Sequence, residues 1–159
     1  MLCILHDVNE IFYNPRSLGY RYELGIAAKL YPIGSSVHFY SQNKHTYYLI
    51  QNALEYGFTH ESNTLIATLS KYAKSKLPAS SHLKKYEDLL PSHEITTTLS
   101  FLLSLAISLL SHRPRNIDFK MNFKDGLLTV DSASNFYISK EAVSKLDVIE
   151  KDFKVTFNS

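Results

Sequence analysis

The residues near the amino terminus that could do chemistry are a histidine and two carboxylates within five positions. His6 is followed directly by Asp7, and Glu10 stands four residues beyond His6. On a helix, His6 and Glu10 would therefore share one face. A histidine that accepts a phosphoryl group needs a neutral attacking nitrogen and a carboxylate that orients the ring. The spacing predicts a phospho-accepting site at His6, Asp7 and Glu10, against the alternative that a His-Asp pair arises by chance.

Other patterns that mark catalytic or metal sites are missing from the sequence. It contains no Walker motif, no GxGxxG, no GxSxG and no HExxH. The seven histidines include no pair four residues apart, and Cys3 is the only cysteine. We therefore expect no metal, no cofactor and no disulfide framework.

Charge and hydropathy limit the partners that the sequence predicts. The 159 residues carry a formal net charge of only +2, which does not indicate a nucleic-acid groove. Ten basic residues lie between positions 71 and 140, but acidic residues are interleaved with them, so a solvated surface is expected. The most apolar stretch, 95–110, is shorter than a membrane span and interrupted by serines. Without a recognisable secretory signal, the chain is expected to be cytoplasmic.

The elements that must position these residues follow from hydrophobic periodicity, which predicts an α+β fold with a helical first two thirds. Helices are expected over residues 2–14, 20–31, 63–77 and 92–112. Residues 35–57 suit either a strand or a helix, and 78–94 form a polar connector with one helical turn. The strongest helix, 92–112, has Ser92 as its N-cap.

The period of the hydrophobic pattern changes in the last third of the chain, where apolar and polar residues alternate. Strands are expected near 117–123, 127–131 and 152–157, as a small sheet packed on the 93–112 helix. Asp125-Gly126 is a hairpin turn signal, and Ser139 is the expected N-cap of a helix over 139–146. The whole chain, 1–159, is expected to form a single compact domain, with a helical sublayer at 1–77 and an α/β sublayer at 92–159.

Tyrosine is unusually frequent in the first 60 residues. Seven of them lie between positions 20 and 56: Tyr20, Tyr22, Tyr31, Tyr40, Tyr47, Tyr48 and Tyr56. Tyrosine combines apolar area with a polar tip, which suits a protein–protein interface. The alternative is an amphipathic helical layer whose hydroxyls simply reach the surface.

The order of the segments resembles the bacterial histidine phosphotransferases that are built like a sensor kinase. Leu5-His6-Asp7-Val8 resembles the acceptor motif of that family, and Ser36-Val37-His38-Phe39-Tyr40-Ser41 is similar to the aromatic end of its second hairpin helix. The segment from Leu99 to Leu110 and the 117–130 hairpin resemble its degenerate ATPase-like domain.

This resemblance implies a two-component phosphorelay. A receiver-domain aspartate would donate a phosphoryl group to His6, with Asp7 or Glu10 orienting the ring, and His6 would pass the group to a second receiver. The receivers would supply the magnesium, and the helical hairpin would form a homodimer. The first alternative is a non-enzymatic adaptor or effector-type protein that binds a partner through its tyrosine-rich helical face. A second is an enzyme whose site is assembled from distant His, Asp and Tyr residues.

Overall fold

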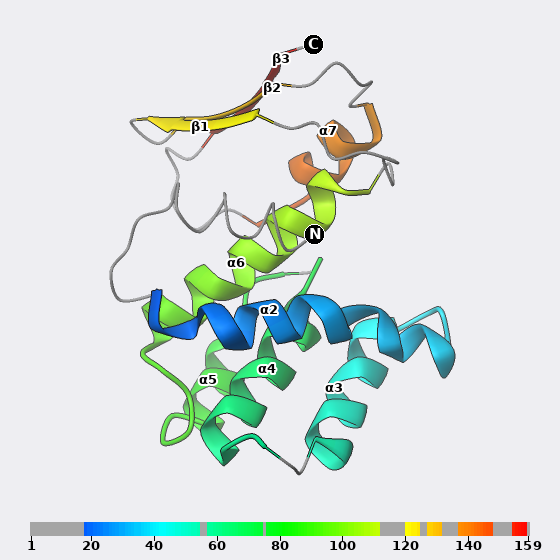
Figure 1. The fold of residues 1–159 in the computed structure, drawn as a ribbon, viewed down its shortest axis with the longest axis vertical. Helices are drawn as coiled ribbons and strands as arrows, with labels where there is room; N and C mark the ends of the chain where they lie inside the picture. The colour runs from blue at the N-terminus through cyan, green and yellow to red at the C-terminus, as the bar shows by residue number, and fades with distance from the viewer. Residues whose placement is uncertain are drawn as a thin grey trace.

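The fold has two layers that meet at one long helix, α6 (His93–Leu109). Figure 1 shows the other larger helices on one side of α6, and a small sheet with α7 on the other. The predicted α+β class, with the sheet after the helices, is confirmed. The computed structural model describes residues 18–54, 57–74, 76–111, 120–124, 127–131, 137–147 and 154–158.

The helical layer is built from short amphipathic helices. Its elements are the 3-10 helices η1 (Leu18–Tyr20) and η2 (Tyr31–Ser36) and the α-helices α2 (Arg21–Leu30), α3 (Gln42–Ala53), α4 (His60–Tyr72) and α5 (Ser80–Lys85). Thr59 caps α4, because its side-chain oxygen accepts a hydrogen bond from Ser62 N at 3.1 Å. The helix α4 packs against both α2 and α3, so it lies at the centre of this layer.

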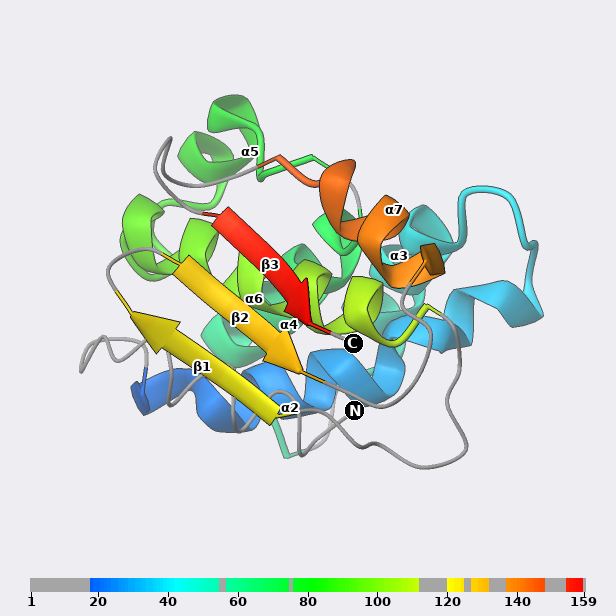
Figure 2. The same ribbon diagram turned by 90° about the horizontal axis from the view of Figure 1, so that it is seen from above.

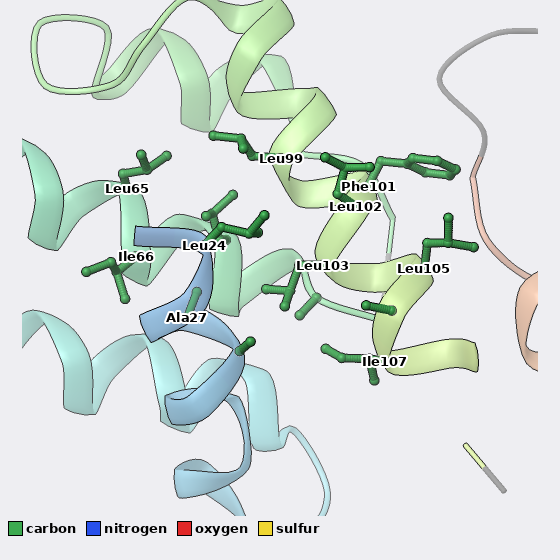
Figure 3. Packing of buried hydrophobic residues seen from close by; sticks show 14 of the residues in the cluster. Leu24, Ala27, Leu65, Ile66, Leu99, Phe101, Leu102, Leu103, Leu105 and Ile107 are labelled. Atoms are coloured by element: carbon green, nitrogen blue, oxygen red, sulfur yellow. The ribbon is translucent and has the colours of Figure 1, made fainter. Parts of the chain in front are cut away.

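The helix α6 carries most of the core. Ser92 is its N-cap, as predicted, and accepts from Ile95 N at 3.4 Å. Every residue from Leu99 to Leu109 is buried. Leu103 lies toward α2 and Leu105 toward α7, as Figure 3 shows. Ser104 lies where α4 ends against α6, and its side-chain oxygen accepts from Lys74 N at 3.0 Å.

The sheet has three strands in the order β1 (Lys120–Lys124), β2 (Leu127–Asp131) and β3 (Lys154–Asn158). The pair β1–β2 is antiparallel. The pair β2–β3 is parallel, and α7 (Tyr137–Ser144) forms part of the connection between these two strands. The sheet lies over α6 in Figure 2. Leu128 and Val130 of the central strand are fully buried.

Several predicted boundaries differ from the structure. The described part of residues 35–57, for which the sequence left a strand or a helix open, contains the end of η2 and the helix α3. The helix α4 ends at Tyr72 rather than at residue 77. The helix α7 begins before Ser139, so this serine does not cap it. Ser139 instead donates to Leu109 O of α6 at 2.8 Å. No helix among the described residues is long and apolar enough to cross a membrane. The division into sublayers at 1–77 and 92–159 stays a prediction.

Candidate anion-binding site

The residues predicted to accept a phosphoryl group are His6, Asp7 and Glu10. All three lie outside the described residues, so their mutual geometry stays untested. Among the described residues, no three His, Cys, Asp or Glu side chains are grouped closely enough to hold a metal ion. The polar cluster with the most contacts in this part of the chain lies elsewhere, in the helical layer.

Polar and aromatic side chains gather where α3, α4 and α5 meet, and we call this group the Lys71 cluster. The helix α4 is central because it supplies the lysine, while α3 and α5 supply the groups around it. The cluster consists of Tyr47, Lys71, Tyr72, His82, Lys85 and Tyr86. The amide of Asn43 on α3 donates to Lys71 O at 2.7 Å and thereby ties α3 to the end of α4.

His82 is the buried centre of the cluster, with 7% of its surface exposed. Its Nδ1 lies 3.2 Å from Lys71 Nζ, and its Nε2 lies 3.0 Å from Thr68 Oγ1. An ammonium group has no lone pair, so His82 Nδ1 must accept from Lys71. The ring proton is therefore on Nε2, which donates to Thr68. Both ring nitrogens are used in this way, and the imidazole is neutral.

The pKa values of the cluster agree with this assignment. Burial, together with the ammonium groups of Lys71 and Lys85, lowers the pKa of His82 to about 4. Burial also lowers the pKa of Lys71; Tyr86 opposes this effect, and Lys85 and Lys44 add to it. The pKa of His82 is therefore low because a protonated ring would be a desolvated cation beside two other cations.

Tyrosine rings surround the Lys71 ammonium. Lys71 Nζ lies 4.6 Å from the ring centre of Tyr47 and 5.4 Å from that of Tyr72. The faces of aromatic rings attract cations, so they partly replace the water that Lys71 loses. The hydroxyls of Tyr47 and Tyr86 are 3.0 Å apart. Burial raises the pKa of Tyr47, and the hydrogen bond to Tyr47 lowers the pKa of Tyr86. Either hydroxyl can donate this bond.

The cluster carries positive charge that no carboxylate among the described residues neutralises. Lys44 and Lys85 lie close enough to Lys71 to lower its pKa further. Within the described ranges, the ion pair is between Lys145 and Glu141, on the other side of α6. The Lys71 ammonium has three N–H donors. Within the described part of the chain, one of them is donated to His82. The remaining donors can bind an anion.

Sequence reasoning missed this cluster and assigned its lysines to a solvated surface. His82 lies in the stretch interpreted as a polar connector, yet the side chains of His82 and Leu83 are buried. The sequence did contain a signal that could have indicated the cluster. His82, Lys85 and Tyr86 lie within five residues and share about one helical turn.

The tyrosine-rich stretch does not form one uniform interaction surface. Tyr40 and Tyr48 are strongly exposed, at 76% and 66%. Tyr47 instead points into the Lys71 cluster, and Tyr31 packs against the core. The stretch therefore includes both exposed and core-packed tyrosines, and the interface interpretation stays a prediction.

Fold and site together define an α+β domain whose helical layer presents a cationic, tyrosine-lined site. Residues 2–150 match the family model "Ppx/GppA phosphatase, domain III", and the chain belongs to this exopolyphosphatase-type family. No curated protein matches the chain.

This family assignment overturns the phosphorelay prediction. The resemblance to sensor-kinase-like histidine phosphotransferases is wrong, and so is the histidine phosphorelay function that it implied. The resemblance depended on short motifs and on the order of elements, and a helical layer followed by a small sheet occurs in unrelated families. The adaptor alternative is only loosely compatible with this family, which points to phosphatase-related function.

Proposed function

We propose that this chain serves as domain III of a Ppx/GppA-type phosphatase and binds the phosphate groups of its substrate through the Lys71 cluster. The observation that carries the proposal is the half-buried Lys71 ammonium, which is held by a neutral histidine and has no carboxylate partner among the described residues. The name of the family, a phosphatase, supplies the class of anion.

The cluster is suited to binding rather than to proton transfer. A general base must offer a free nitrogen to the proton that it takes. Both nitrogens of His82 already have partners, Lys71 and Thr68, and the side chain is buried. The lysines, by contrast, are suited to phosphate, because an ammonium acts as a point charge with several donors.

The test is the binding of inorganic tripolyphosphate to the chain, measured by isothermal titration calorimetry at low and high salt. We expect Lys71→Gln to weaken binding at least tenfold and Lys85→Gln to weaken it less, because Lys85 is exposed and better solvated. Affinity should also fall as salt rises.

The matched control is Lys145→Gln, which removes the same charge from a lysine that Glu141 already neutralises. We expect this variant to bind within twofold of the unmodified chain. If Lys71→Gln and Lys145→Gln lower the affinity for tripolyphosphate equally, net charge alone governs binding. That result, or no measurable binding of tripolyphosphate, would overturn the proposal.

A further inference from the structure

On the opposite side of α6, the small layer leaves an open cavity of about 650 Å³. This volume is in the range of small-molecule pockets. The apolar walls come from three elements that meet there. They are Phe101 and Leu105 of α6, Val143 and Leu146 in and after α7, and Val155 and Phe157 of β3.

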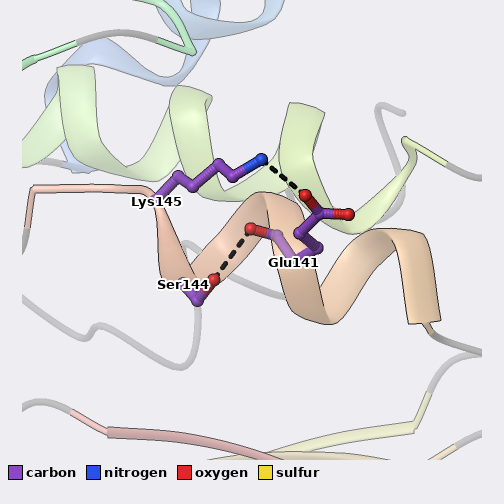
Figure 4. A network of polar contacts seen from close by, with 3 residues as sticks. All are labelled: Glu141, Ser144 and Lys145. Carbon is purple, nitrogen blue, oxygen red and sulfur yellow. Dashed lines mark hydrogen bonds and ion pairs between the residues drawn. The ribbon is translucent and has the colours of Figure 1, made fainter.

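One cation lies at this cavity, and its side chain is exposed to solvent. Lys140 of α7 lines it, and its Nζ lies 5.8 Å from the ring centre of Phe157. The nearest carboxylate in sequence, Glu141, is held by Lys145 at 2.6 Å, as Figure 4 shows. No carboxylate is among the described residues that line the cavity. The charge of Lys140 therefore has no anionic partner in the described part of the chain.

The other polar groups at the cavity already have hydrogen-bond partners in the protein. Ser144 Oγ donates to Glu141 O at 2.9 Å, within the network of Figure 4. Thr156 Oγ1 donates to Thr129 Oγ1 at 3.3 Å. Asn158 Nδ2 donates to an oxygen of Asp131 at 2.8 Å. A ligand in this cavity would thus meet apolar walls and a single available charge.

We infer that this cavity binds an amphiphilic anion with one hydrocarbon tail, such as a medium-chain fatty acid, whose carboxylate pairs with Lys140. The apolar walls favour the tail, because burying its surface removes it from water. They disfavour polyphosphate, since each additional charge would be desolvated without a partner. The site therefore differs in ligand class from the Lys71 cluster and goes beyond the proposed function.

The experiment compares decanoate with 1-decanol and decyltrimethylammonium, which share the tail and differ in the head group. Binding to the chain is measured by isothermal titration calorimetry below the micelle concentration. We expect decanoate to bind at least tenfold more tightly than the other two. Lys140→Gln should abolish that preference and leave the binding of 1-decanol unchanged.

Two further variants separate the cavity from the rest of the surface. Lys145→Gln removes an equal charge directly after the same helix. We expect this variant to bind decanoate with an affinity within twofold of that of the unmodified chain. Val143→Phe fills the cavity and should abolish the binding of decanoate and of 1-decanol, with helicity checked by far-UV circular dichroism. If Val143→Phe does not fold, charge reversal in Lys140→Glu, which should reverse the preference toward decyltrimethylammonium, takes its place.

The outcomes that would overturn the inference are specific. They include equal affinity for all three head groups, equal losses in Lys140→Gln and Lys145→Gln, and no binding of decanoate. Sedimentation with phosphatidylglycerol vesicles, without a response to soluble decanoate, would indicate a membrane-facing surface instead of a cavity. A dimer that Val143→Phe dissociates would mean that a second copy fills the cavity.

Discussion

The two sides of α6 are packed differently, although the same buried helix forms both. On the side of α2 and α4, side chains such as Leu24, Leu65 and Leu103 are almost fully buried and belong to one continuous core. On the side of α7 and β3, a cavity of about 650 Å³ lies beside side chains that pack against this same core. Dense packing stabilises a fold, whereas the side chains around a cavity make fewer van der Waals contacts, and a cavity often marks a binding site. The helical layer therefore combines dense packing with the Lys71 cluster, whereas the small layer leaves space for a second ligand.

The largest effect should come from truncating α6 on its densely packed side. Leu103 has no exposed surface, and Figure 3 shows it directed toward α2. Leu103→Ala should lower the free energy of unfolding by about 2–5 kcal/mol, because it removes apolar burial and leaves a void. Urea unfolding followed by circular dichroism measures this change. A loss below about 1 kcal/mol would show that the core is not centred on this side.

Acid should weaken the helical layer through His82. The pKa of this residue is about 4 in the folded chain, below the usual 6.5, so the unfolded chain binds more protons between these values. The free energy of unfolding should therefore fall as pH drops from about 6.5 to 4, by up to about 3 kcal/mol. Above pH 6.5 this contribution is fully present.

The control for this prediction is His82→Gln, whose neutral amide can accept from Lys71 and donate to Thr68. We expect the variant to lose the part of the acid sensitivity that belongs to residue 82. The comparison uses urea unfolding of both proteins across the same pH range. Parallel stability profiles would contradict a depressed pKa at His82.

Periodicity in the sequence was sufficient to predict α6 and the strands β1 and β2, but it left residues 35–57 open between a strand and a helix. The helix at 93–109 and the strands β1 and β2 follow from strong local patterns and from Ser92 as a cap. The Lys71 cluster could not be predicted this way, because α3, α4 and α5 each contribute part of it. Tyr47 and Tyr86, for example, are 39 residues apart in sequence. Nor does any local pattern indicate that a cavity remains between α6, α7 and β3.

A second leucine of α6 tests the difference between the two sides directly. Leu105 is as buried as Leu103 but lines the cavity. Leu105→Ala should cost about 2 kcal/mol, at the low end for such a change, because one side of this leucine already borders the cavity and its truncation creates less new void. If Leu105→Ala destabilises the chain as much as Leu103→Ala does, the cavity is filled in solution and the contrast between the two sides disappears.

The smallest effect concerns the hydrogen bond that holds α7 to α6. Ser139 Oγ donates to Leu109 O at 2.8 Å in a buried position. Carbonyl groups in the last turn of a helix lack partners within that helix, so this bond satisfies one of them. Ser139→Ala should cost about 1 kcal/mol in urea unfolding. The matched control is Ser144→Ala, because Ser144 makes an exposed hydrogen bond within α7. That variant should change stability by less than about 0.5 kcal/mol. Equal costs for both variants would mean that α7 is not anchored to α6 through Ser139, and the wall that carries Lys140 would need another anchor.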